Sequence, residues 1–165
     1  MALEVMSPAG SFESVVAAVR GGADAVYFGA GDFNARRNAK NLTDEELAEA
    51  MKYCRLRGVK TYITVNTLVT DRELSRAREL IEKLTVMGAD AIIVQDLGMA
   101  RLIKAVSPQM TMHGSTQMSV HTPEGAKELA ALGYDRVILA RELSVKEISE
   151  IRDFVPEMQL EAFVH

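Results

Sequence analysis

The chain has 165 residues, of which 48% are hydrophobic and 25% charged, which is the composition of one globular domain with a sizeable core rather than of a disordered chain. The formal net charge of −4 disfavours a general nucleic-acid clamp, which usually carries a basic stripe. A single cysteine excludes a disulfide framework, and with no apolar run near the roughly 18 residues of a membrane span and no signal-peptide pattern we expect a cytoplasmic protein without membrane partners.

Short runs of β-branched, aromatic and other apolar residues alternate with longer stretches of helical spacing. The runs are nearly continuously apolar, which is typical of strands buried on both faces of a parallel sheet. Their starts recur about every 26 residues, a spacing that suits repeated βα units. We expect strands at residues 3–6, 25–28, 61–65, 91–94, 110–113, 136–139 and 159–164.

The stretches between these runs carry helix start and stop signals. Thr43 with Glu46, and Ser144 with Glu147, match the capping-box pattern. We expect Asp71 to cap the helix that follows it, and Pro123 stands after Thr122 at a first helical position. Helix ends are predicted at glycines that tolerate positive φ, namely Gly22, Gly58, Gly88 and Gly133.

This alternation predicts a parallel (β/α) barrel of the TIM type that is incomplete, with about seven strands and six helices. A complete barrel has eight such units. The last predicted strand has no helix to cover it, so we interpret residues 1–165 as a single partial barrel domain and as the N-terminal fragment of a longer protein. A doubly wound open sheet is the alternative, but no GxGxxG loop follows the first strand.

Polar residues follow almost every predicted strand. In a barrel, active-site residues lie at the carboxyl ends of the strands and in the loops that follow them. We therefore expect catalytic roles for His113, Arg141, Asn66 and Gln117, and substrate-binding roles for Ser7, Tyr27, Asn34, Arg36, Asn38, Gln95, Ser115, Glu142 and His165.

Some of these positions also have a purely structural interpretation. Ser7 lies in a Ser-Pro-Ala-Gly segment that could form only a turn before Ser11 caps a helix. Asp96 could likewise only cap a helix. Arg141 and Glu142 are adjacent, so both cannot point into the same barrel mouth from a regular strand. We expect one of them at the site and the other as a cap or ion-pair partner.

Metal ligation and nucleophilic catalysis have weak sequence support. His113 and His165 fall at two strand ends but lack a carboxylate at a fixed spacing, so we assign no metal site. Cys54 lies on the apolar stripe of a predicted helix and is expected in the core. Neither HExxH nor GxSxG occurs, and Ser115 near His113 is not a nucleophile–base pair by spacing alone.

Several segments, in this order, resemble the N-terminal region of the peptidase U-32 family, also called collagenase-like peptidases. The last of them, Glu-Ala-Phe-Val-His at 161–165, resembles the opening of the family signature E-x-F-x-H, which continues with glycine and then cysteines. The chain ends before that glycine. The other matching segments are residues 7–10, 22–27, 34–36, 65–66, 113–117 and 137–143.

The resemblance implies two different activities. The family name implies a peptidase, whereas other members are oxygen-independent hydroxylation factors for tRNA wobble uridine, an rRNA cytidine or the ubiquinone ring. These factors bind a 4Fe–4S cluster through four cysteines that follow the signature. Residues 33–41, 94–96 and 116–117 look most similar to the rRNA branch.

We therefore expect an RNA-modifying hydroxylation factor that acts on rRNA or tRNA. Its cluster-binding cysteines lie beyond the C-terminus in this interpretation, so the fragment itself holds no cofactor and is inactive alone. Arg36, Arg37 and Lys40 are candidates for an RNA or phosphate contact, although they could equally be solvated charges. A collagenase-like protease with a peptide substrate, a non-catalytic binding domain and an unrelated phosphate-binding barrel enzyme remain as alternatives.

Overall fold

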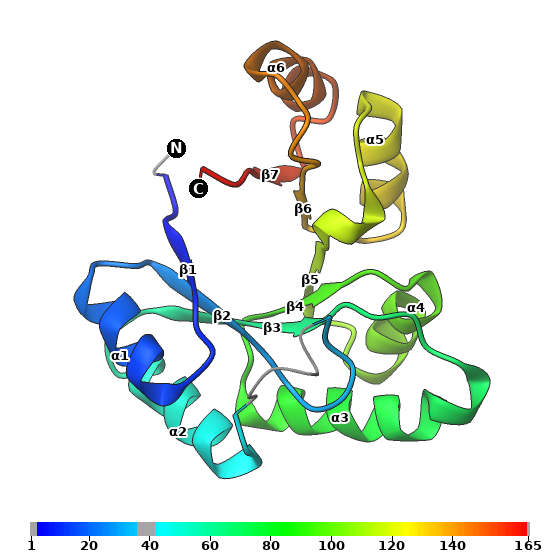
Figure 1. The fold of residues 1–165 in the computed structure, drawn as a ribbon. Helices are drawn as coiled ribbons and strands as arrows, with labels where there is room; N and C mark the ends of the chain where they lie inside the picture. Colours follow the sequence, from blue (N-terminus) through cyan, green and yellow to red (C-terminus); the bar gives the residue numbers. More distant parts are fainter. Residues whose placement is uncertain (1–2, 36–41, 165) are drawn as a thin grey trace.

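Seven parallel strands curl into an open barrel, and the helices lie on its outer side (Figure 1). The computed structural model describes residues 3–35 and 42–164. Neighbours in the chain are neighbours in the sheet, so the sheet order is the chain order. The strands are β1 (Met6–Pro8), β2 (Ala25–Gly29), β3 (Lys60–Val65), β4 (Ala91–Val94), β5 (Thr111–Gly114), β6 (Arg136–Ile138) and β7 (Gln159–Glu161).

One α-helix connects each strand to the next, which confirms the predicted incomplete (β/α) barrel. Short 3-10 turns, η1 (Asp71–Glu73) and η2 (Thr116–Met118), lie in the connections after β3 and β5. The α-helices are α1 (Phe12–Arg20), α2 (Asp44–Arg55), α3 (Leu74–Met87), α4 (Leu97–Val106), α5 (Pro123–Ala131) and α6 (Val145–Phe154).

Most helix starts follow the predicted capping chemistry. Thr43 and Ser144 form the expected capping boxes, and Asp96 Oδ1 accepts a hydrogen bond from the Met99 N–H at 2.8 Å. The prediction for Asp71 was wrong, because this residue lies inside η1. The turn begins instead at Thr70, whose N–H and hydroxyl donate to the Glu73 carboxylate at 2.9 and 2.7 Å.

The first and last strands differ most from their predicted ranges. β1 begins at Met6 rather than at residue 3, because the Val5 N–H donates to the Asp24 carboxylate at 2.8 Å and ladder pairing with β2 starts one residue later. β7 ends at Glu161, where its pairing with Ile138 ends, three residues before the predicted limit.

The strands bury two separate faces, because successive side chains point to opposite sides of a sheet. The outer face packs against the helices and forms the larger core, in which Cys54 is buried as predicted. The inner face is lined by a smaller cluster of Ala25, Tyr62, Ala91, Ile93 and Ile138, with Met6 and Tyr27 packed against it. Among the described residues, none of the helices combines the length and the apolarity that crossing a membrane requires.

Candidate active site at the carboxyl ends of the strands

A pocket of about 280 Å³ lies inside the barrel at the carboxyl ends of the strands. Apolar side chains of the inner cluster, among them Met6, Ile93 and Ile138, form its floor. Because the ends of parallel strands meet at one edge, residues that are far apart in sequence meet here. The predicted site residues that line the pocket are Tyr27, Asn34, Asn66, Ser115, Gln117 and Arg141.

The other described site predictions lie away from this pocket. Ser7 stands between the pocket-lining residues Met6 and Pro8, so strand alternation places it on the opposite face. Gln95 follows β4 and is half-buried. Glu142 is exposed, and its carboxylate lies 3.8 Å from His121 Nε2, so of the adjacent pair it is Arg141 that lines the pocket. Arg36, Asn38 and His165 lie outside the described residues.

His113 is buried inside the barrel and does not border the pocket. Its ring meets the Tyr62 ring edge-on, with 4.6 Å between ring centroids. Burial, reinforced by the nearby positive charge of Arg136, lowers its pKa to about 3. Nδ1 is buried, and no described residue offers it a hydrogen bond. The imidazole is therefore neutral at physiological pH.

Asn66 links three segments around the pocket. Its Oδ1 accepts a hydrogen bond from the Ala35 N–H at 3.0 Å, and its Nδ2 donates to Ser115 Oγ at 3.3 Å. Ser115 Oγ also accepts from the Gln117 N–H at 3.3 Å. The end of β3 thus holds the loop after β2 against the loop after β5, which fixes the polar rim of the pocket.

Gly29 and Asn34 pack closely on one side of this rim. Asn34 is 1% exposed, and its Nδ2 donates to the Gly31 carbonyl at 2.8 Å. A Cβ atom at Gly29 would lie 2.6 Å from the Asn34 side chain. Only glycine therefore allows this approach, and Asn34 both lines the pocket and shapes the loop after β2.

Arg141 and Phe163 form a stacked pair at the pocket rim. The guanidinium carbon lies 4.2 Å from the centre of the phenyl ring, which is a cation–π contact, and both residues line the pocket. Phe163 was not among the predicted site residues. Its alternation with Glu161 along the end of the chain, every second residue on one face, is the signal that could have identified it.

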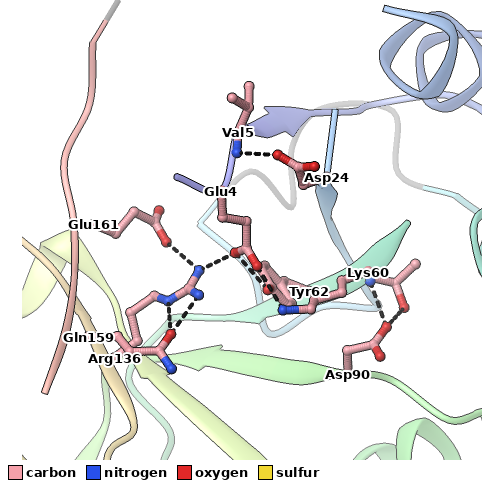
Figure 2. A network of polar contacts seen from close by, with 10 residues as sticks. Glu4, Val5, Asp24, Lys60, Tyr62, Asp90, Arg136, Gln159 and Glu161 are labelled. Carbon is pink, nitrogen blue, oxygen red and sulfur yellow. Dashed lines mark hydrogen bonds and ion pairs between the residues drawn. The ribbon is translucent and has the colours of Figure 1, made fainter. Parts of the chain in front are cut away.

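The polar network around Glu4 and Arg136 that Figure 2 shows lies at the amino ends of the strands, whereas the pocket lies at their carboxyl ends. Glu4 accepts hydrogen bonds from Arg136 at 2.7 Å and from Tyr62 and Lys60, each at 2.8 Å. Burial of Glu4 opposes ionisation, but the hydrogen bonds from these three residues outweigh it and lower the pKa to about 2. Glu4 is therefore a carboxylate throughout the physiological range.

Glu161 connects this network to the pocket. Its side chain is 15% exposed and lines the pocket, and its carboxylate lies 3.5 Å from Arg136 Nη1. Burial, only partly opposed by Arg136 and reinforced by the negative charge of Glu4, raises its pKa to about 7. Glu161 stands in the predicted last strand and opens the signature-like segment 161–165, but neither it nor Glu4 nor Arg136 was among the predicted site residues. An arginine inside an otherwise apolar buried strand was the available signal.

A match to a protein-family model identifies the family of the chain. The model of peptidase family U32 matches residues 10–165. The chain belongs to peptidase family U32. This confirms the resemblance that the strand-end motifs indicated.

Curated relatives of this U32 chain carry two kinds of name. The chain is 39% identical to the 23S rRNA 5-hydroxycytidine C2501 synthase of Escherichia coli, over 99% of the chain and 24% of the relative. It is 34% identical to the tRNA hydroxylation protein P1 of Bacillus subtilis, over 98% of the chain and 38% of the relative. It is also 37% identical to a collagenase of Porphyromonas gingivalis, over 92% and 36%.

A solved structure has the same fold as the chain. A U32 peptidase structure superposes on 98% of the chain and 68% of that structure, with a TM-score of 0.81 and 17% identity. At this identity the likeness shows the fold alone. The chain spans about a quarter to two fifths of the length of the curated relatives named above.

The described residues do not fit the 4Fe–4S cluster that the resemblance to the hydroxylation factors implies. Such a cluster needs several thiolate ligands. Burial raises the pKa of the one cysteine, Cys54, to about 11, and its thiol lies in the helix-facing core. Within residues 3–35 and 42–164, no group of three or more His, Cys, Asp or Glu residues is arranged to hold a metal ion. The expectation that cluster ligands lie beyond this chain stays a prediction.

Proposed function

We propose that the chain forms the substrate-binding part of an RNA-modifying factor that hydroxylates a pyrimidine base without molecular oxygen. The observation that carries this proposal is the pocket itself, which combines neutral hydrogen-bonding side chains with an arginine–phenylalanine stack. The names of the rRNA- and tRNA-hydroxylating relatives support the same reaction class.

The pocket chemistry suits a single unstacked base. RNA-binding proteins commonly take such bases by stacking them on aromatic or arginine planes and by hydrogen bonds to the base edges. Arg141 and Phe163 supply the planar surfaces. Gln117 supplies a side-chain amide that can both donate and accept hydrogen bonds. Within the described part of the chain only its backbone N–H is hydrogen-bonded, to Ser115, and the amide makes no hydrogen bond. The volume of about 280 Å³ is near the lower end for ligand sites, as expected for one base.

The peptidase alternative has less support from the geometry. The Ser115 hydroxyl contacts the Asn66 amide and the Gln117 N–H, neither of which is a general base. His113 is neutral and buried below the pocket, and Cys54 is buried outside the barrel. The described residues therefore do not assemble an activated nucleophile of the serine or cysteine type.

The redox part of the reaction is outside these residues. In our proposal the described residues bind and orient the base, and the electron-transferring group is held by a part of the protein beyond them. The basic residues Arg36, Arg37 and Lys40 are proposed contacts for the RNA backbone and lie outside the described residues.

The test is nucleoside analysis of RNA from a bacterial host that lacks its own rRNA and tRNA hydroxylation genes and expresses the chain in its full reading frame. We expect 5-hydroxycytidine or 5-hydroxyuridine to appear in the digested RNA, and to be reduced at least tenfold by Gln117→Ala. Gln109→Ala is the matched control, because Gln109 is exposed just before β5, at the opposite end of the barrel. Cleavage of denatured collagen by the purified protein, without any hydroxylated nucleoside, would overturn the proposal in favour of the peptidase.

A further inference from the structure

Glu161 is a carboxyl group that the floor of the pocket holds away from bulk water. It is 15% exposed, borders the pocket and stands beside Ile138 in the β6–β7 register. An ionised carboxylate in such a place needs a cation at hydrogen-bonding distance. The one cation in contact with it among the described residues is Arg136, whose Nη1 donates a hydrogen bond to Glu161 Oε2 at 3.5 Å, which is long for such a bond.

Arg136 is committed to other partners. The same Nη1 atom that reaches Glu161 lies 2.7 Å from Glu4, and the side-chain Oε1 of Gln159 accepts hydrogen bonds from Nη2 at 2.7 Å and Nε at 3.2 Å. The guanidinium is therefore held toward Glu4 and Gln159 (Figure 2). The positive charge of Arg136 therefore stabilises the Glu161 carboxylate only weakly.

The other polar groups inside the barrel do not compensate Glu161. Lys60 and Tyr62 of β3 both donate to Glu4, and His113 of β5 is neutral. At the rim, Arg141 is stacked on Phe163. The negative charge of Glu4 adds to the cost of ionising Glu161. Both the ionised and the protonated form of the Glu161 carboxyl are therefore accessible at the pocket floor.

We propose that Glu161 is the group that exchanges a proton with the bound substrate, and that Glu4, below the floor, is a positioning residue that sets this exchange by holding Arg136. The carboxylate accepts a proton from an N–H or O–H group of the substrate, the bonding electron pair stays on the substrate heteroatom, and the carboxylic acid returns the proton. The proposal rests on the proposed function only for the identity of the substrate. A pKa of about 7 for Glu161 supports it, because both forms are then populated at neutral pH.

The direct test is a carbon-detected NMR titration of the glutamate side-chain carboxyls in the protein without substrate, with Glu161→Gln to assign the signal. We expect the Glu161 signal to titrate near neutral pH, well above the ordinary value for glutamate of 4.5. If no glutamate carboxyl signal of the unmodified protein titrates above pH 4.5, the proposal is overturned, and this outcome needs no variant to fold.

Two variants then test the part played by Arg136. Glu4→Gln removes a negative charge and releases Arg136, so the Glu161 midpoint moves to lower pH. Arg136→Met removes the contacting cation, so the midpoint moves to higher pH. Glu79→Gln is the matched control, since Glu79 is exposed on α3 outside the network, and it leaves the midpoint unchanged. Equal midpoints in all three variants would contradict the positioning role of Glu4.

The activity arm separates this inference from the proposed function. If hydroxylated nucleosides are formed, we expect Glu161→Gln to reduce their rate of formation at least a hundredfold while the affinity for a pyrimidine nucleotide changes less than threefold. We also expect Glu4→Gln to move the acidic limb of the pH–rate profile to lower pH. Full activity in Glu161→Gln would overturn the inference and leave the proposed function standing. If Glu161 titrates near neutral pH but no RNA hydroxylation is detected, the proposed function is overturned. The assignment of Glu161 as the proton-exchanging group then still stands.

Discussion

Arg136 Nη1 and Glu4 Oε1 lie 2.7 Å apart below the floor of the pocket, although 132 residues separate them in the chain. The pair joins the segment before β1 to the start of β6 across the interior of the barrel (Figure 2). A buried ion pair costs much of its attraction in lost hydration, so the pair is weak as a source of stability. Its clearer consequence is electrostatic, because it leaves Glu161 poorly compensated.

Glu161→Gln should change the pH dependence of stability. The folded-state pKa of about 7 lies above the ordinary value of 4.5, so the folded protein keeps a proton that the unfolded chain has lost. The free energy of unfolding therefore falls as pH rises from about 4.5 to 7, by about 3 kcal/mol for the full shift. The variant lacks this loss. Urea denaturation should therefore show that its free energy of unfolding, relative to that of the unmodified protein, is higher at pH 8 than at pH 4.5 by about this amount. A difference that stays constant between the two pH values would contradict the raised pKa.

His113→Phe should make the protein more resistant to acid. The pKa of His113 is lowered to about 3 in the fold against 6.5 when exposed, so its contribution to stability is lost as pH falls through this window. The difference in free energy of unfolding between the variant and the unmodified protein should therefore be about 2–3 kcal/mol more favourable to the variant at pH 4.5 than at pH 7.5. RNA hydroxylation measured on the same variant separates the predicted catalytic role from a structural one, because a core histidine can be replaced by phenylalanine with activity retained. Equal effects on stability at both pH values would show that the imidazole is not held neutral.

Asn66→Ala should loosen the pocket rim without unfolding the protein. The change removes the acceptor of the Ala35 N–H and the donor to Ser115 Oγ, and each lost hydrogen bond costs about 1 kcal/mol. We expect the affinity for a pyrimidine nucleotide to fall about tenfold, measured by calorimetry. Ser149→Ala on α6 removes one exposed side-chain hydrogen bond away from the pocket and serves as the control. Unchanged affinity in Asn66→Ala would show that the linked loops do not shape the binding site.

The thiol of Cys54 should be unreactive in the folded protein. Burial raises its pKa to about 11, so almost no thiolate is present at neutral pH, and the side chain is fully covered by the helix-facing core. A disulfide reagent at pH 7.5 should modify it only in denaturant. Rapid modification of the native protein would contradict the core position.

Cys54→Ala should lower the free energy of unfolding by about 1–2 kcal/mol through the small cavity it leaves.

The barrel could be predicted because its information is local. Apolar runs such as β4 and capping boxes such as that at Thr43 act within a few residues, and both were predicted correctly. The strand-end rule also led to Asn66 and Arg141, which line the pocket. Errors occurred where a distant group decides the local structure. The Asp24 carboxylate, for example, binds the Val5 N–H and delays the start of β1.

The network below the floor could not be predicted for the same reason. Glu4 and Arg136 stand in segments whose local patterns give no sign of each other, and only the closure of the sheet brings them together. His113 shows the opposite case. Its place at a strand end suggested a site residue, but alternation and depth place it under the pocket against Tyr62. Depth along the barrel axis follows from the register between strands, which here pairs His113 with Ile93 and Arg136.

Binding of a pyrimidine base in the pocket can be tested by an NMR titration of the protein with cytidine and uridine 5′-monophosphate, followed through the side-chain amide signals of asparagine and glutamine. We expect saturable shifts for Gln117 and Asn66, which line the pocket, and none for Gln109 at the opposite end of the barrel. Collagen-like peptide added under the same conditions should leave all of these signals in place. Saturable shifts of the pocket signals with the peptide and none with either nucleotide would contradict the assignment of the pocket to a pyrimidine base.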